Sequence, residues 1–164
     1  MGATGSVWRV THVPPPVLAL LAAVGQRLLT PRPASPTAPR IAAAATLALA
    51  SGTSAAGAAK RFSQGGTTVD PVHPDRASVL VTSGPNSVTR NPMYVGLTGL
   101  LLANAVRRGS WAGLLPVAFF VTAIDRLQIV PEEQALRAKF GAQYDDYCAA
   151  VPRWLDRRSF TRPR

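Results

Sequence analysis

The sequence has few residues that could build a metal or disulfide site. Cys148 is the only cysteine, and His12 and His73 are the only histidines in the 164 residues. A lone cysteine cannot form a disulfide within the chain, and zinc sites need several cysteine or histidine ligands. These absences exclude an intramolecular disulfide and a multi-histidine metal site.

Charged residues are also scarce. They make up 16% of the chain, against roughly 25% in an average soluble domain. Hydrophobic residues make up 47%, and the mean hydropathy is +0.12. The low charged fraction argues against a disordered chain, and the length fits one domain. This composition is unusual for a soluble protein and typical of a small membrane protein.

The few charges are strongly biased to one sign, with 18 Lys and Arg against 8 Asp and Glu. Such a bias can indicate nucleic-acid binding. Here, however, Lys60 and Lys139 are the only lysines, and the arginines lie between and after apolar runs. Arginines that flank apolar segments follow the positive-inside rule of membrane proteins. The charge therefore predicts membrane topology and no nucleic-acid partner.

Four uncharged runs are long enough to be candidates for membrane-spanning helices. They are residues 10–26, 41–59, 91–106 and 109–124. Prolines 31, 33, 36 and 39 exclude a helix in the linker after the first run. Small residues in the second run favour close packing against another helix, and the polar turn at 107–110 joins the last two runs into a hairpin. The sequence thus predicts an all-α, integral membrane bundle of about four transmembrane helices.

The first run has an alternative interpretation as a cleaved signal peptide, because Arg9 precedes it. The later hairpin favours a span that is retained. With four spans, 13 of the 18 basic residues lie on the side of the N-terminus, the second loop and the tail. This side is expected to face the cytoplasm.

After the last run, Pro131 followed by Glu132 and Glu133 is a typical helix start. An apolar stripe at helical spacing follows, which predicts an amphipathic C-terminal helix at the membrane surface or over a cytosolic pocket. The stripe contains Leu136, Phe140, Tyr144, Tyr147, Cys148 and Val151, and it is more often packing than a cofactor site. The chain divides into two spans with a proline-rich linker at 1–59, a core at 60–155 and a basic tail at 156–164.

Two polar stretches lie beside the predicted spans, at residues 80–94 and 125–133. Arg90 and Tyr94 flank the Asn-Pro pair that starts the third span. Glu132 and Glu133 project about 100° apart on a helix, so one can face a pocket while the other caps the helix. Taken singly, these residues could equally be interfacial anchors and span ends.

The order of the motifs is more specific than any one of them. It runs Leu80-Val-Thr-Ser-Gly-Pro85, Arg90-Asn-Pro-Met-Tyr94, a hairpin, Glu132-Glu-x-x-Leu136, Phe140-Gly-x-x-Tyr144-x-x-Tyr147 and Val151-Pro-Arg-Trp154. Over residues 60 to 155 this order resembles the isoprenylcysteine carboxyl methyltransferase family, which forms one superfamily with the phospholipid N-methyltransferases.

The resemblance implies S-adenosylmethionine as the methyl donor, bound at the cytosolic ends of the last spans. The implied cofactor-binding residues are Ser78, Val79, Leu80, Val81, Asn86, Asn91, Pro92, Met93, Tyr94 and Glu132. Three positions depart from the family pattern: Asn91 replaces a histidine, Asn86 replaces an aromatic residue, and Gln128 replaces a substrate-side arginine.

Arg90 and Glu133 are the candidate catalytic residues, and Arg126 and Gln128 are the candidate substrate-binding residues. Arg90 or Arg126 can hold an anionic acceptor group or the carboxylate of the cofactor, and a glutamate can accept a proton from an amine acceptor.

The leading hypothesis is a membrane carboxyl O-methyltransferase of the isoprenylcysteine type, which acts on a prenylated or other lipophilic acceptor. One alternative is a phospholipid or amine N-methyltransferase, and another is a non-catalytic membrane protein that keeps the fold.

Overall fold

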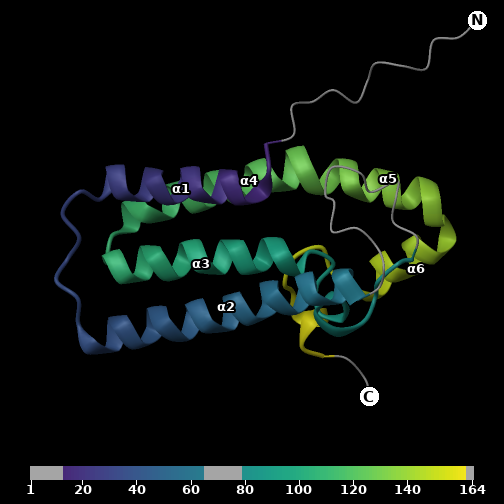
Figure 1. Cartoon of the computed structure of the whole chain (residues 1–164), viewed down its shortest axis with the longest axis horizontal. Coiled ribbons are helices and arrows are strands. Elements are labelled where there is room, and N and C mark those ends of the chain that lie inside the picture. Colours follow the sequence, from purple (N-terminus) through teal and green to yellow (C-terminus); the bar gives the residue numbers. More distant parts are fainter. Residues whose placement is uncertain (1–12, 65–78, 162–164) are drawn as a thin grey trace, which may run out of the picture.

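The computed structural model describes residues 13–64 and 79–161, which form helices and connecting turns without any strand (Figure 1). The elements are α1 (Pro15–Leu29), α2 (Ala38–Gln64), η2 (Gly84–Ser87), α3 (Pro92–Arg108), η3 (Trp111–Gly113), α4 (Leu114–Ile124), the π-helical turn η4 (Asp125–Ile129), α5 (Val130–Phe140), α6 (Ala142–Ala150) and η5 (Arg157–Ser159). The all-helical prediction is confirmed for these residues.

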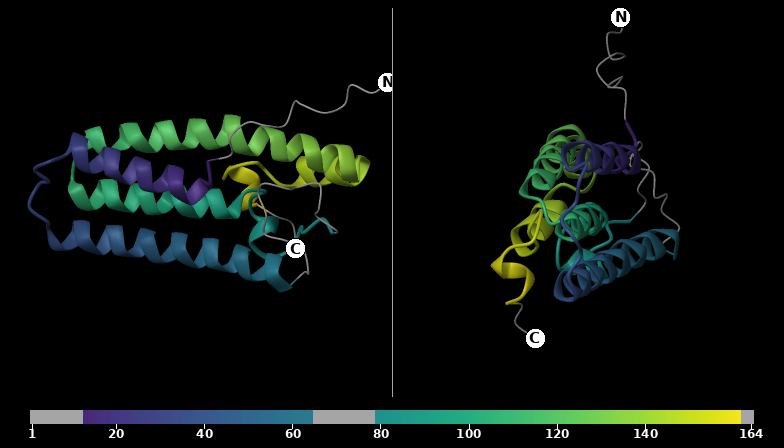
Figure 2. Two further views of the ribbon diagram at one scale, coloured as in Figure 1. Left: turned by 45° about the horizontal axis from the view of Figure 1, so that its top comes forward. Right: turned by 90° about the vertical axis from the view of Figure 1, so that its left-hand side faces the viewer.

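Helices α1 to α4 lie side by side, and consecutive helices run in opposite directions (Figure 1, Figure 2). Helix α3 contacts the other three, α1 also packs on α4, and α2 packs mainly on α3. The core between α1, α3 and α4 consists of Ala22, Tyr94, Leu101, Val117, Phe120, Ile124 and Ile129. The four uncharged runs thus correspond to four neighbouring helices, although residues 10–12 of the first run lie outside the described residues.

The boundaries of the helices follow the turn residues of the sequence. Helix α3 ends at Arg108, and Gly109 caps it in a left-handed conformation with φ +62°, which glycine adopts without strain. The predicted polar turn between the third and fourth runs is therefore confirmed. The predicted exclusion of helix holds for the linker up to Pro36, but it was wrong for Pro39, which lies in the first turn of α2, where proline is tolerated.

Small residues bring α2 and α3 into close contact. A Cβ atom on Gly96 would lie 2.7 Å from the Cβ of Ala55 and 2.8 Å from the backbone oxygen of Ser51, and a Cβ on Gly99 would overlap the Ser51 side chain. Helices in membranes commonly associate through such small residues, because van der Waals contact and not the hydrophobic effect drives their packing. The packing role expected for the small residues of the second run is confirmed.

The helix start predicted at Pro131 was wrong, because a continuous helix runs from Trp111 to Phe140. Proline lacks the N–H of an ordinary helical hydrogen bond, and its ring crowds the carbonyl one turn earlier. The turn before Pro131 is wound as a π-helix, in which the N–H of Val130 donates to the backbone oxygen of Asp125. This wider turn lets the helix continue through the proline.

The single C-terminal amphipathic helix predicted from the apolar stripe is divided in two. Gly141, with φ +52°, separates α5 from α6 and turns the chain back toward the bundle. The stripe itself packs as expected: Tyr144, Tyr147 and Val151 are buried together, with Leu136, Phe140 and Cys148 against them. Its interpretation as packing is confirmed.

Of the described helices, only the one at Trp111–Phe140 is both long and apolar enough to cross a membrane. Helix α1 is apolar but has 15 residues, or about 22 Å, against a hydrocarbon core of about 30 Å. The outer faces of α1 and α4 nevertheless expose large apolar side chains. They include Leu20, Leu21, Val24, Leu28, Leu115 and Phe119.

A buried amide ties the bundle together at the end remote from α5 and α6. Gln26 is fully buried, and its Nε2 donates to the backbone oxygens of Leu101 and Gly113, both at 2.9 Å. Its Oε1 accepts from Asn104 Nδ2 at 2.7 Å. Because a buried amide needs all its partners, this set of bonds holds α1, α3 and η3 in one register.

We expect Gly96→Ala to loosen the contact between α2 and α3, because the added methyl group meets backbone as well as side-chain atoms. Overpacking of this kind costs about 1–3 kcal/mol. Gly52→Ala is the matched control on α2, since nothing lies within 4 Å of a Cβ there, and it should be neutral or slightly stabilising. Thermal unfolding of both proteins in the same detergent measures the difference, and equal midpoints would contradict the packing described.

Candidate functional site

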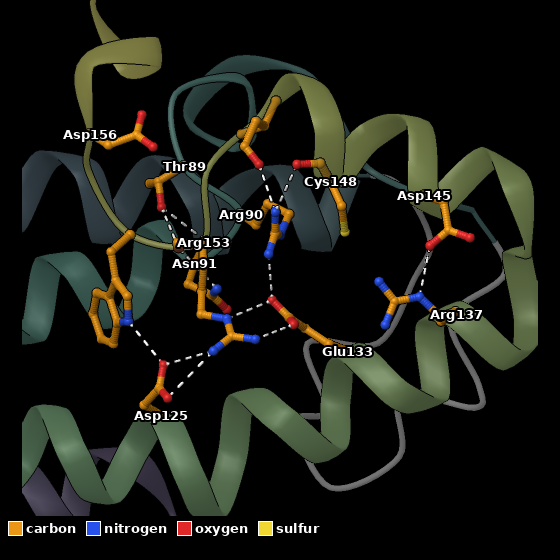
Figure 3. A network of polar contacts seen from close by, with 12 residues as sticks. Thr89, Arg90, Asn91, Asp125, Glu133, Arg137, Asp145, Cys148, Arg153 and Asp156 are labelled. Carbon is orange, nitrogen blue, oxygen red and sulfur yellow. Dashed lines mark hydrogen bonds and ion pairs between the residues drawn. The ribbon is translucent and has the colours of Figure 1, made fainter.

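Three segments that are far apart in the sequence meet where α3 begins. They are residues 89–94, residues 125–133 of the long helix, and residues 151–154, which follow α6 (Figure 3). Gly141 makes this meeting possible, because α6 must fold back along α5 to bring the chain after it to the start of α3 (Figure 1).

Glu133 lies at the centre of this region and accepts from two arginines (Figure 3). Arg90 Nη2 lies 2.8 Å from its Oε1, and Arg153 binds it in a bidentate manner, with Nε 3.0 Å from Oε1 and Nη2 2.6 Å from Oε2. The side chains of Arg90 and Glu133 are each only 11% exposed. The hydrogen bonds to Glu133 raise the pKa of Arg153 further above its usual value, so the guanidinium stays charged.

Asp125 is the second carboxylate that Arg153 contacts. Arg153 Nη1 lies 3.3 Å from Asp125 Oδ1, and Trp154 Nε1 donates to the same oxygen at 3.1 Å. Residues eight apart on a regular α-helix differ by about 80° in direction, whereas the extra residue of a π-turn reduces this to about 20°. The π-turn before Pro131 therefore places Asp125 and Glu133 on one face, where a single guanidinium reaches both.

Arg90 also binds the end of α6. Its Nη1 donates to the backbone oxygens of Cys148 at 3.1 Å and Val151 at 2.7 Å, and its backbone N–H donates to the oxygen of Pro152 at 2.8 Å. These carbonyls belong to the last turn of a helix and the chain after it, where backbone acceptors lack helical partners. Arg90 thus holds the C-terminal segment in place.

The residues on either side of Arg90 hold the same segment. Thr89 Oγ1 and Asn91 Nδ2 both donate to the backbone oxygen of Arg153, at 2.8 and 3.1 Å. In this chain Asn91, which stands where the family pattern has a histidine, is therefore a hydrogen-bond donor to the backbone.

Glu132 faces a different set of partners from its neighbour Glu133. Tyr94 OH donates to Glu132 Oε1 at 2.7 Å, and Gln128 Nε2 donates to the same oxygen at 2.8 Å. Tyr94 and Gln128 are both buried. The two adjacent glutamates therefore point into two clusters, as expected for side chains about 100° apart on a helix.

The segment before α3 packs on the aromatic residues of α6. Leu80 contacts the cluster of Tyr144, Tyr147 and Val151, and Tyr147 OH donates to the backbone oxygen of Asn86 at 2.6 Å. Burial raises the pKa of the Tyr144 phenol, so it stays neutral. Asn86 is itself buried, and its Oδ1 has no hydrogen-bond partner among the residues that the structure describes.

The other predicted site residues lie in several environments. Pro92 is buried at the start of α3, and Met93 packs on the bundle core. Val79 is exposed and Val81 is half-buried, while Ser78 lies outside the described residues. Arg126 is the most separate, because its side chain is 76% exposed and its nearest ion-pair contact, to Asp125, is 3.9 Å long.

The structure adds three residues to the site for which the sequence predicts no individual role: Asp125, Arg153 and Trp154. A signal was present, because acidic residues are scarce and three of the eight lie between residues 125 and 133. Their arginine partners could not be chosen from the sequence, where every arginine fits the topology equally well.

We expect Glu133→Gln to destabilise the protein strongly, because it leaves the buried Arg90 guanidinium without its carboxylate. Breaking a buried pair costs about 3 kcal/mol or more. Asp145→Asn is the matched control, since it breaks the Arg137–Asp145 pair, whose side chains are both more than half exposed, and such pairs contribute little. Thermal unfolding of the two variants compares them, and a Glu133→Gln midpoint equal to that of Asp145→Asn would contradict a structural role for the Glu133 pairs.

A family described as phospholipid methyltransferase matches residues 39–143, an interval that covers nearly all of α2 and the predicted core as far as the start of α6. The chain is also similar to an uncharacterized protein of Haemophilus influenzae, with 40% identity over 63 residues, which is 38% of this chain and all of the relative. No solved structure matches. Since the family match covers more than half of the chain, the protein belongs to the phospholipid methyltransferase family, a family of membrane-associated methyltransferases.

Proposed function

We propose that the protein is an S-adenosylmethionine-dependent methyltransferase that acts on a lipophilic acceptor. One observation carries the proposal: the three motif segments meet at one end of a helical bundle whose outer faces are apolar. At such an end a methyl donor from the aqueous phase can meet a methyl acceptor that stays in the membrane. Membership of the phospholipid methyltransferase family supports this function.

The residues at this end fit the proposed cofactor. An unpartnered buried acceptor such as Asn86 Oδ1 costs about 1–3 kcal/mol, and an amino group of the cofactor would supply the missing donor. Leu80, beside the Tyr144 and Tyr147 rings, offers apolar surface, and the Glu132 carboxylate can accept from hydroxyl or amino groups. When bound, S-adenosylmethionine supplies an activated methyl group on a sulfonium.

The cluster of Glu132, Tyr94 and Gln128 would orient the methyl donor and balance its positive charge. Two neutral donors, Tyr94 and Gln128, hold one carboxylate oxygen of Glu132 and so fix the orientation of this side chain. An ionised carboxylate stabilises a nearby positive group. We propose this role for Glu132, with Tyr94 and Gln128 as positioning residues.

Arg90 and Glu133 are proposed to contribute mainly by position. Their ion pair, with Arg153, keeps residues 151–154 over the start of α3. Methyl transfer needs the acceptor in line with the methyl group and water excluded. A C-terminal segment held in this way would serve both requirements without direct contact between Arg90 and the reacting atoms.

The hydrogen bonds of Glu132 and Glu133 favour a methyl acceptor that needs no general base. Both oxygens of Glu133 bind arginine, and Glu132 accepts from Tyr94 and Gln128. Carboxylates whose oxygens already accept these hydrogen bonds are poorly placed to take a proton from an acceptor. A carboxylate acceptor of the isoprenylcysteine type is already nucleophilic, and the exposed Arg126 guanidinium can bind it. The second candidate is N-methylation of a phospholipid or other amine, which the description of the matching family favours.

The membrane arrangement is part of the proposal. We propose that α1 to α4 all cross the bilayer, with the ends of α1 and α3 adapting to its thickness. We also propose that the end carrying Glu132 and Glu133 faces the cytoplasm, as the distribution of basic residues indicates.

Cofactor affinity tests the proposed donor site. Glu132→Gln removes the charge and keeps the shape, and we expect it to weaken S-adenosylmethionine binding about tenfold or more, since a hydrogen bond to a charged group contributes about 1.5–3 kcal/mol. Asp146→Asn, on the exposed side of α6, is the control and should bind as the wild type. Calorimetry on the purified protein measures both. If the wild type shows no saturable binding, the proposed function is wrong.

The chemistry of the product distinguishes the two acceptors. Membranes supplied with S-adenosylmethionine labelled in its methyl group should yield lipid-soluble label that base releases as methanol if the product is a carboxyl ester. Label that resists base and stays on an amine would instead support the N-methyltransferase. We expect Arg126→Gln to raise the KM for a carboxylate acceptor and leave cofactor affinity unchanged. Absence of any transfer above a Glu132→Gln control would indicate a non-catalytic protein.

A further inference from the structure

We propose that the end of the bundle opposite the site binds anionic phospholipid headgroups. This end holds five arginines, from three helices and a linker. They are Arg27 near the end of α1, Arg32 in the linker, Arg40 in the first turn of α2, and Arg107 and Arg108 at the end of α3 (Figure 1). Five positive charges at one end of a small bundle repel one another unless anions lie nearby.

The protein itself supplies no such anion in the part of the chain that the structure describes. All six described acidic residues lie between Asp125 and Asp156, at the site end, where nine of the described basic residues also lie. Every ion pair among the described residues is also at the site end. Three of the five arginines donate instead to neutral groups: Arg40 to the oxygen of Ser35, Arg107 to Asn104 Oδ1, and Arg108 to Thr30.

One of these guanidinium groups is held in place before any ligand binds. Arg108 donates through Nε to Thr30 Oγ1 and through Nη2 to the Thr30 backbone oxygen. Thr30 in turn donates to the oxygen of Gln26, whose amide ties α1 to α3. An arginine already fixed in position loses less conformational entropy when it binds an anion.

The position of Arg40 is a separate argument for an external anion. It lies in the first turn of α2, which contains no acidic residue, and a cation there opposes the helix dipole. Its guanidinium lies against Gly109, where an added Cβ would be only 2.5 Å from Nη1. Arg40 therefore lies beside the C-terminal end of α3, which carries Arg107 and Arg108, and a bound anion would reduce the repulsion among the positive charges gathered there.

Exposed apolar and aromatic side chains lie at the same end of the bundle as these arginines. Trp111 is 88% exposed and Leu28 is 72% exposed, and both lie at this end of the bundle. An exposed tryptophan beside arginines is typical of the boundary between hydrocarbon and headgroups. A lipid with an anionic phosphate matches both the charge of the arginines and the apolar side chains next to them, whereas a soluble anion matches the charge alone.

Lipid-dependent thermal stability tests this proposal without any cofactor, so its outcome is independent of the proposed methyl transfer. Purified protein in neutral detergent receives either dioleoyl phosphatidylglycerol or dioleoyl phosphatidylcholine, which have the same acyl chains. We expect phosphatidylglycerol to raise the unfolding midpoint by about 5 °C more than phosphatidylcholine does. Equal shifts from the two lipids would overturn the proposal.

A pair of charge-matched variants locates the effect. The triple variant Arg27→Gln, Arg32→Gln and Arg40→Gln should lose the extra stabilisation by phosphatidylglycerol, whereas Arg137→Gln, Lys139→Gln and Arg157→Gln, at the site end, should keep it. Loss of the effect in both variants would mean that net charge alone attracts the lipid, against the proposal. Arg32→Gln alone, in the exposed linker, should give a partial loss and serves if the first triple variant does not fold.

Inorganic phosphate separates a headgroup site from a site for any anion. At the same ionic strength, phosphate should give less than half of the shift that phosphatidylglycerol gives, because it lacks the acyl chains that contact Trp111 and Leu28. An equal shift with phosphate would overturn the lipid assignment.

Discussion

The ion pairs of Glu133 are the interaction on which the functional end of this protein depends. One buried carboxylate binds Arg90, which precedes α3, and Arg153, which follows α6. Buried charges are tolerated only when they are paired and hydrogen-bonded. These pairs, together with the hydrogen bonds from residues 89–91 to the backbone of Pro152 and Arg153, hold the three segments together, and the C-terminal segment covers the start of α3 as a result.

This pairing requires an irregular helix. Asp125 and Glu133 share Arg153 because the π-turn rotates one toward the other. The π-turn in turn accommodates Pro131, whose missing N–H and bulky ring do not fit an ordinary turn. The proline therefore has a function different from the helix start that it resembles: it shifts the register of a long helix, so that Glu133 meets the arginines and Glu132 meets Tyr94 and Gln128.

The two ends of the bundle differ in how their charges are balanced. Arginines at the site end bind carboxylates of the same chain, so they mainly hold the structure together. Arginines at the other end bind backbone oxygens, a threonine and an asparagine. A basic chain of this composition can thus keep an organised polar site at one end, and its excess positive charge remains for partners outside the protein at the other.

The four helices of the bundle and the order of the motifs can be predicted from the amino-acid sequence, because long uncharged runs, prolines and glycines act on their own neighbourhood. The run at 41–59 lies within α2, the run at 91–106 lies within α3 except for its first residue, and the apolar stripe is buried as predicted. Three features could be seen only in the folded structure: α4 continues into α5, Gly141 turns α6 back, and Asp125 and Glu133 both pair with Arg153. The physical reason is distance along the chain: a local pattern specifies a helix, whereas the partner of a buried charge depends on which distant segments the folded bundle brings within hydrogen-bonding reach.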